Sequence, residues 1–133
     1  SSDLHAIHAA TDITGFGLAG HAMQMARESN CSFVINNEDV PLFSLTKSSL
    51  AKQHLTRAHK TNWDYTKEHI ELDLNLSDLD RYVIVDPQTS GGLLLSVDKN
   101  SAGKLVAKLK QEFPMTAVIG EVTEKKEKKI YFS

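Results

Sequence analysis

The chain has 133 residues, of which 41% are hydrophobic and 24% charged, and its formal net charge is −2 at pH 7. This length and balance fit one globular domain with a core of its own. The near-neutral charge and the lack of any apolar run approaching about 20 residues favour neither a nucleic-acid nor a membrane partner. The single cysteine, Cys31, excludes an internal disulfide framework and predicts a reduced, cytoplasmic location.

The first third of the chain predicts two helices and a strand. Residues 3–10 are rich in alanine and predict a short helix. Residues 16–28 predict a longer, largely buried helix, because apolar side chains form a wide stripe at helical spacing. We expect Thr14 at its N-cap. Residues 31–35 have the composition of a strand.

The middle of the chain is less regular. Residues 41–55 predict a weak helix, and residues 56–76, which lack periodicity, predict a long loop. A capped single turn is expected at residues 77–80, followed by a buried strand at residues 82–85. The run of leucines within residues 93–97 predicts a second strand, buried on both faces because its pattern does not alternate.

The last third predicts a helix and a hairpin. Residues 100–113 are amphipathic and predict a helix with Leu105, Val106, Leu109 and Phe113 inward. Residues 116–122 and 130–132 are interpreted as the two strands of a closing hairpin, with the lysine-rich residues 125–129 as its turn. Strands interleaved with helices predict an α/β (α+β) fold, in which helices pack on a mixed, largely antiparallel sheet.

Residues 15–20, GFGLAG, match the three-glycine pattern of dinucleotide-binding folds. Such a site requires a buried strand that leads into the first glycine. Residues 8–14 are too polar and too rich in alanine to predict that strand. We therefore interpret the glycines as permitting close packing at the start of a helix.

Asp12 precedes the helix expected at residues 16–28, where the helix dipole would stabilise a negative charge. Two roles are open from the residues alone. Asp12 could cap the helix, or it could bind Mg²⁺, which takes one or two carboxylates together with phosphate and water oxygens at phosphoryl-transfer sites. One carboxylate cannot hold the metal well, so the other ligands would have to come from elsewhere.

Residues 86–92, DPQTSGG, predict a sharp connection between two strands, because Pro87 fixes φ and the glycines permit positive φ. Two interpretations are open here as well. Exposed backbone N–H groups and the hydroxyls of Thr89 and Ser90 could bind an anion, or the loop could be a turn that only holds two strands together.

Two of these motifs together resemble one enzyme family. Residues 10–21, ATDITGFGLAGH, are similar to a signature of the selenophosphate synthetases (selenide, water dikinases), and residues 86–93, DPQTSGGL, are similar to a second. Residues 61–63, TNW, resemble a short segment between them. The order and spacing match over nearly all of residues 5–120. The resemblance implies the C-terminal domain fold of the aminoimidazole ribonucleotide synthetase-like superfamily.

The resemblance also implies a reaction in which ATP, selenide and water give selenophosphate, AMP and phosphate, in a homodimer. It implies that Asp12 is a Mg²⁺ ligand. The residues that it places near the nucleotide phosphates are Thr14, Gly15, Gly17, Thr89, Ser90 and Gly91. No segment matches the family's N-terminal ATP-binding domain, with its catalytic cysteine or selenocysteine. We therefore expect residues 1–133 to be a single, incomplete C-terminal domain that holds no catalytic residue and is inactive alone.

Two other functions remain open. The chain could be a non-catalytic regulatory module from a paralogue that has lost selenide chemistry. It could also belong to a related ATP-dependent synthetase that acts on a purine or thiamine precursor. That enzyme would need phosphate-binding basic residues near residues 86–92, and none is close to them in the sequence.

Overall fold

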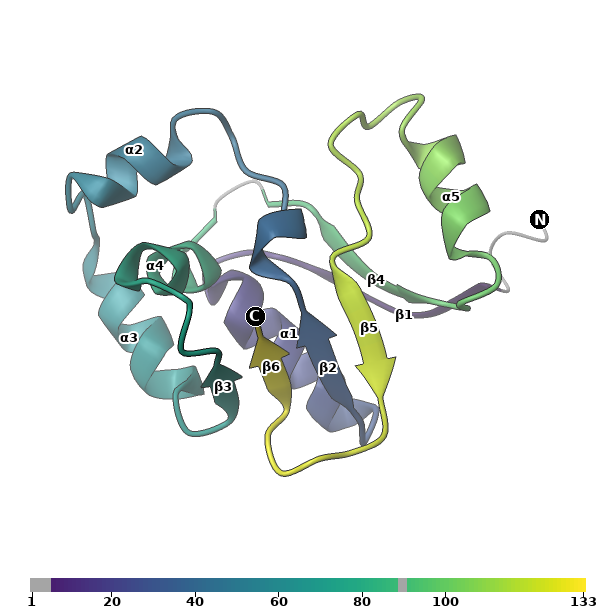
Figure 1. Cartoon of the computed structure of the whole chain (residues 1–133), viewed down its shortest axis with the longest axis horizontal. Coiled ribbons are helices and arrows are strands. Elements are labelled where there is room, and N and C mark those ends of the chain that lie inside the picture. The colour runs from purple at the N-terminus through teal and green to yellow at the C-terminus, as the bar shows by residue number, and fades with distance from the viewer. Residues whose placement is uncertain (1–5, 89–90) are drawn as a thin grey trace.

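The computed structural model describes residues 6–88 and 91–133, which form helices packed on mixed β-structure (Figure 1). The described strands form two sheets. The first has the order β1-β4, with β1 at Ile7–Asp12 and β4 at Leu93–Val97. The second has the order β3-β6-β2-β5, with strands at Ile70–Leu72, Ile130–Phe132, Ser32–Ile35 and Gly120–Thr123.

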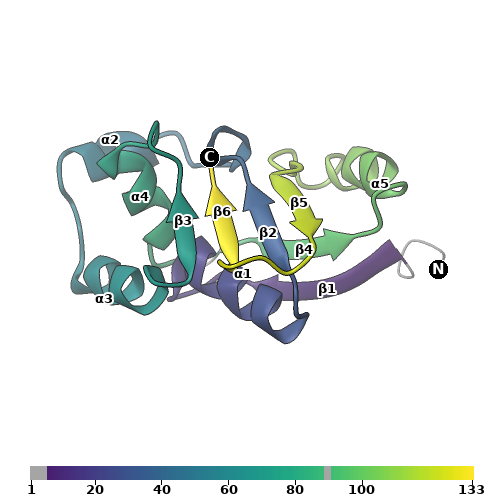
Figure 2. The ribbon, with the colours of Figure 1, turned by 60° about the horizontal axis from the view of Figure 1, so that its bottom comes forward.

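The strand pairing confirms a mixed α/β fold. Strand β1 runs antiparallel to β4, and β2 runs antiparallel to β5, whereas β6 runs parallel to both β2 and β3. The predicted hairpin of residues 116–122 and 130–132 is wrong, because β2 lies between β5 and β6 (Figure 2). The hydroxyl of Ser32, at the start of β2, donates to Lys128 O and accepts from Lys126 N–H. The connection therefore passes around the end of β2.

Helix α1, at Gly17–Glu28, confirms the buried helix predicted from residues 16–28. It covers one face of the four-stranded sheet, as Figure 2 shows. Ala19, Ala22, Met23 and Ala26 have no exposed surface and belong to the same core as Phe33 and Phe132 of the sheet. Burying a large apolar side chain such as Met23 contributes roughly 1.5–3 kcal/mol to folding.

The start of the chain differs from its prediction. Residues 7–12 form strand β1 and not a helix, while residues 3–5 lie outside the described part of the chain. Pairing with β4 outweighs the helix propensity of the alanines, which is a weak preference. A strand therefore does precede the glycines at 15–20, contrary to the sequence interpretation. It lies in a different sheet from β2, so the parallel βαβ unit of dinucleotide-binding folds is not formed.

Helix α3, at Arg57–Thr66, and strand β3 replace the predicted loop of residues 56–76. The helix begins with a capping box in which His59 occupies the position where Glu or Gln is usual. Its Nδ1 accepts the backbone N–H of Thr56 at 2.9 Å. The sequence did not predict this helix start, because the acceptor of the capping box is a histidine and not the usual Glu or Gln.

Helix α4, at Asp78–Val85, corrects the strand predicted at residues 82–85. The predicted cap at residue 77 is confirmed, since the Ser77 hydroxyl accepts the Asp80 N–H and the Asp80 carboxylate accepts the Ser77 N–H. The predicted single turn is the first turn of this longer helix, whose apolar C-terminal residues, Val83, Ile84 and Val85, are buried.

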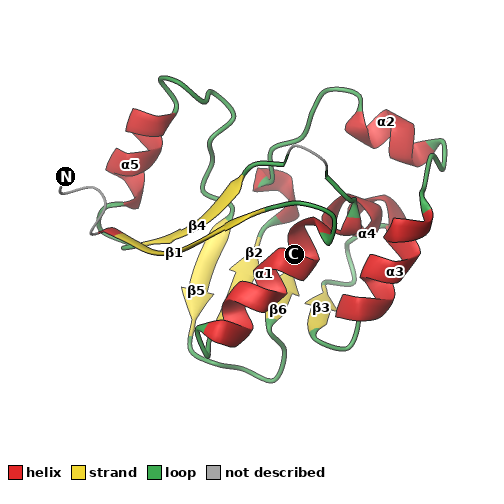
Figure 3. Ribbon diagram, turned by 180° about the vertical axis from the view of Figure 1, so that it is seen from behind, coloured by secondary structure: helices red, strands yellow, loops and turns green. Residues whose placement is uncertain are grey.

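The remaining elements lie where the sequence predicted them, but some of their side chains are more exposed than predicted. Helix α2, at Thr46–Ala51, lies inside residues 41–55, and α5, at Ala102–Leu109, lies inside residues 100–113. Leu105, Val106 and Leu109 are partly buried, but Phe113 lies beyond the helix and is 60% exposed. Strand β4 is not buried on both faces: Leu93 is 67% exposed. Figure 3 shows α5 beside the β1–β4 ribbon, away from the other helices. None of the helices in the described residues is long and apolar enough to cross a membrane.

Candidate functional site

The two signature motifs lie side by side at one end of the β1–β4 ribbon. We call residues 14–17 the glycine turn and residues 86–92 the proline loop. Strand β1 pairs with β4 up to the partners Asp12 and Leu93. Beyond that pair, Ile13 N–H donates to Gly92 O at 2.9 Å, and Gln88 N–H donates to Thr14 O at 3.1 Å. Backbone hydrogen bonds therefore join motifs that are more than 70 residues apart in sequence.

Two glycines permit this close approach. Gly17 has φ +72°, and a Cβ added there would lie 3.0 Å from Asp86 O and 3.0 Å from Val85 C. A Cβ at Gly91 would overlap the carbonyl oxygen of Ile13. Both glycines therefore serve the contact between the two motifs. Gly15 differs, since a Cβ added there would meet no described atom within 4 Å.

The predicted N-cap of α1 is wrong. Phe16 occupies the cap position, and among the described residues neither Thr14 nor Asp12 provides a side-chain cap. The carbonyl of Thr14 instead accepts the N–H of Gly17 at 3.0 Å, which closes the turn. The hydroxyl of Thr14 lies 3.0 Å from Nε2 of His21, one of the buried polar residues of α1.

The surroundings of His21 favour its neutral form. Burial lowers the pKa of His21, and the negative charge of Asp12 opposes this shift without cancelling it. The ring of His21 also contacts Phe16, with centroids 5.6 Å apart. The site therefore places a buried imidazole behind the glycine turn and an exposed carboxylate, Asp12, beside it.

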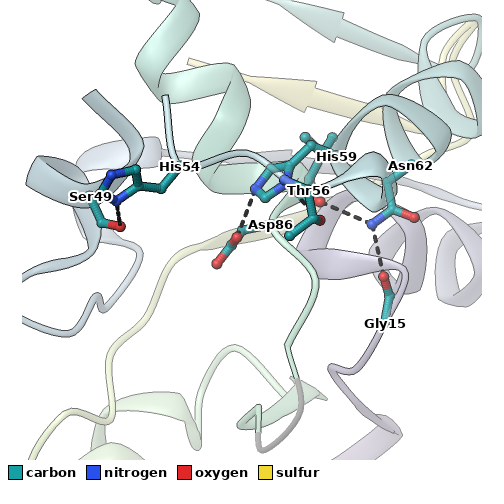
Figure 4. Close-up of polar contacts among 8 residues, drawn as sticks. Gly15, Ser49, His54, Thr56, His59, Asn62 and Asp86 are labelled. Carbon is teal, nitrogen blue, oxygen red and sulfur yellow. Dashed lines mark hydrogen bonds and ion pairs between the residues drawn. The ribbon is translucent and has the colours of Figure 1, made fainter. Parts of the chain in front are cut away.

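Helix α3 holds both motifs through two buried side chains (Figure 4). The Nδ2 of Asn62 donates to Gly15 O at 2.8 Å and to Val85 O at 3.0 Å. The Nε2 of His59 lies 2.8 Å from Oδ1 of Asp86. Because Nδ1 of His59 accepts a backbone N–H, the ring proton lies on Nε2, which is close to the carboxylate but is not aligned with it as a hydrogen bond.

An open pocket of about 510 Å³ lies between the glycine turn and the first turns of α3. Its lining residues come from these two segments: Thr14, Gly15, Phe16, Arg57, Ala58, Thr61 and Asn62. Arg57 and Thr61 are exposed on the α3 side. A ligand in the pocket would meet a guanidinium, hydroxyls and the backbone of the glycine turn.

The residues predicted to lie near phosphates are thus separated by the structure. Thr14 and Gly15 line the pocket, whereas Gly17 is buried against α4 and Gly91 packs on Ile13. Thr89 and Ser90 lie outside the described residues. His59 was missed by sequence reasoning, although the spacing of Thr56 and His59 resembles a capping box. Asn62 appeared there only within the TNW segment, with no role.

Asp12 is the acidic residue that the sequence predicts as a Mg²⁺ ligand. It is exposed at the last position of β1. Across residues 6–88 and 91–133, no group of three or more His, Cys, Asp or Glu side chains is placed to hold a metal ion. An exposed carboxylate fits the oxygen preference of Mg²⁺, and it leaves room for ligands from another domain.

The fold and site define an α/β domain in which a buried helix starts at a glycine turn, locked to a proline loop and flanked by an exposed aspartate. Residues 2–133 match the family model described as AIR synthase related protein, C-terminal domain. The chain belongs to this family.

Within this family, the chain is similar to curated selenide, water dikinases. The chain is 44% identical over 126 residues to a selenide, water dikinase of Bdellovibrio bacteriovorus, which covers 95% of this chain and 36% of the relative. It is 45% identical over 129 residues to a selenide, water dikinase of Nitrosomonas eutropha, covering 97% of this chain and 37% of the relative. The chain thus spans little more than a third of these relatives' length.

A solved structure supports the fold alone. The crystal structure of hydrogenase maturation protein HypE matches with a TM-score of 0.56 and 19% sequence identity. The match covers 90% of this chain and 29% of that one. It agrees with the mixed α/β architecture and carries no statement about substrate.

Proposed function

We propose that this chain is the C-terminal domain of a selenophosphate synthetase, which converts ATP, selenide and water into selenophosphate, AMP and phosphate. The observation that best supports this proposal is that the two signature motifs contact each other and form one site, with Asp12 exposed at its edge. The similarity to selenide, water dikinases over 95% of the chain supports the choice of substrate. In this proposal an N-terminal ATP-binding domain supplies the nucleophile and most of the metal ligands.

The role of Asp12 is to give one carboxylate oxygen to Mg²⁺ at the boundary with that domain. The bound metal would neutralise charge on the transferring phosphoryl groups. Thr14 and Gly15 would face the phosphates from the pocket. Thr89 and Ser90, which lie outside the described residues, are proposed as further phosphate-binding residues. Gly17 and Gly91 would act indirectly, by allowing the two motifs to approach. The homodimer and the cytoplasmic location belong to the same proposal.

The division of labour follows from what the described residues offer. Phosphoryl transfer needs several charges around the phosphates and an in-line nucleophile. Asp12 is one carboxylate, and Cys31 is not suited to be the nucleophile, because burial raises the pKa of its thiol. The chain would therefore contribute to the site without completing it.

The test is an assay of the longer protein with ATP, Mg²⁺ and selenide, read by ³¹P NMR. We expect selenophosphate and AMP in equal amounts. The chain of 133 residues, assayed alone, should form neither product. ATP hydrolysis at the same rate with and without selenide, or turnover of a purine or thiamine precursor in its place, would contradict the proposal.

A further inference from the structure

The glycine turn has few internal supports. Its backbone is closed by the bond from Gly17 N–H to Thr14 O and tied to the proline loop by Gln88 N–H, which donates to the same oxygen. Gly15 is exposed, and a Cβ added there would touch no described atom within 4 Å. The direction of the Gly15 carbonyl therefore depends on the group that binds its oxygen, and that group is the amide of Asn62.

The amide of Asn62 is fixed in place. Its side chain is 3% exposed, and its two Nδ2 hydrogens serve carbonyl oxygens 47 and 23 residues away, on Gly15 and Val85. A primary amide is suited to this task because it has two donors on one nitrogen. The backbone oxygen of Asn62 accepts the hydroxyl of Thr66 at 2.8 Å, which ties the residue to the next turn of α3.

The two oxygens that Asn62 joins belong to the segments whose contact forms the site. Val85 ends α4 just before the proline loop, and Gly15 lies in the turn that follows Asp12. Gly17 packs against the same end of α4. Asn62 therefore ties the glycine turn to the end of α4 on the side that faces the pocket, in addition to the backbone bond from Gln88 to Thr14.

We propose that Asn62 is a positioning residue: it holds the glycine turn so that Asp12 and Thr14 face the metal and phosphates. Its effect on metal binding rests on the proposed function, whereas its effect on the turn does not. Partners that orient metal ligands typically change metal affinity by about 10–100-fold when removed. We therefore expect Asn62→Ala to raise the Mg²⁺ concentration for half-maximal activity by roughly tenfold.

The control is Thr66→Val on the same helix. Thr66 is fully buried and donates to Asn62 O, so Thr66→Val removes a buried hydrogen bond without touching the turn. Both variants should destabilise α3, and both are compared at equal folded fraction. Only Asn62→Ala should move the amide NMR signals of Gly15 and Phe16 in the 133-residue chain and raise the Mg²⁺ requirement of the longer protein.

Three outcomes decide the proposal. Displaced turn signals with an increased Mg²⁺ requirement in Asn62→Ala alone support it. Equal effects of Asn62→Ala and Thr66→Val on both readouts overturn it, since the role would then be structural support of α3. If Asn62→Ala does not fold, Asn62→Leu, which keeps the shape of the side chain and removes both donors, takes its place, and wild-type behaviour in both readouts overturns the proposal. A longer protein that makes no selenophosphate refutes the proposed function, and the NMR comparison still decides the role of Asn62 in the turn.

Discussion

Replacing Gly17 by alanine tests the contact between the two motifs. The left-handed φ of +72° costs a residue with a Cβ about 1–2 kcal/mol. The new Cβ would also lie 3.0 Å from Asp86 O and from Val85 C, and 3.1 Å from Ile84 O. These are backbone atoms at the end of α4, which cannot rotate away, and overpacking of this kind typically costs about 1–3 kcal/mol. We expect a total loss of roughly 2–5 kcal/mol, the sum of these two effects.

The assay is urea unfolding, followed by circular dichroism and by the fluorescence of Trp63, the single tryptophan of the chain. The matched control is Gly15→Ala two residues earlier, where an added Cβ meets no described atom within 4 Å and φ is not in the left-handed range. Its unfolding free energy should stay within about 0.5 kcal/mol of the wild type. If the two variants were equally stable, Gly17 would not be packed against α4 in solution and the reasoning would be refuted.

Two further predictions concern histidines. Asp86→Ala removes the carboxylate that lies 2.8 Å from the buried Nε2 of His59 and should lower the unfolding free energy by about 1 kcal/mol. Asp78→Ala, at a carboxylate 80% exposed, should change the unfolding free energy by no more than about 0.5 kcal/mol in urea unfolding. Equal losses would contradict a specific contact between His59 and Asp86. The pKa of His21, followed by NMR, should lie below the ordinary value of about 6.5, and Asp12→Asn should lower it further, because the carboxylate raises it. Because the pKa of His21 is lower in the folded chain, the unfolded chain binds the His21 proton more readily. The contribution of neutral His21 to stability is therefore present above about pH 6.5 and is lost as the pH falls through the native pKa of His21. A pKa that rises in Asp12→Asn would contradict the assigned cause.

The sequence predicted the elements whose signals are local. Helix α1 followed from its wide apolar stripe, β2 from its composition, and the start of α4 from the cap at Ser77. In each case the residues of the element itself were enough to predict its structure. The two signature motifs were likewise visible as continuous stretches, and with them Asp12.

The elements that were missed depend on partners distant in sequence. Strand β1 contains the helix-favouring Ala9 and Ala10, and it exists because β4 pairs with it. The β-branched end of α4 resembles a strand, and the helix that begins at Ser77 carries it. The hairpin of β5 and β6 failed because β2 inserts between them, which no turn signal could reveal.

The candidate site shows the same division. The sequence located the glycine turn and the proline loop separately, but their contact is formed by backbone bonds and by glycines that pack on distant carbonyls. Asn62 and His59 act from α3, a helix without apolar periodicity that begins with an unusual capping residue. Missing that helix meant missing both side chains.

We propose that Asp12 gives its carboxylate to Mg²⁺ in a selenophosphate synthetase. The most direct measurement is a Mg²⁺ titration of activity in the longer protein with Asp12→Asn, beside Asp39→Asn as a control at an exposed aspartate on the 3₁₀ turn of Asn37–Asp39. We predict that Asp12→Asn raises the half-maximal Mg²⁺ concentration by at least about tenfold, and that Asp39→Asn leaves it unchanged. An Asp12→Asn protein with the Mg²⁺ dependence of the wild type would contradict the account.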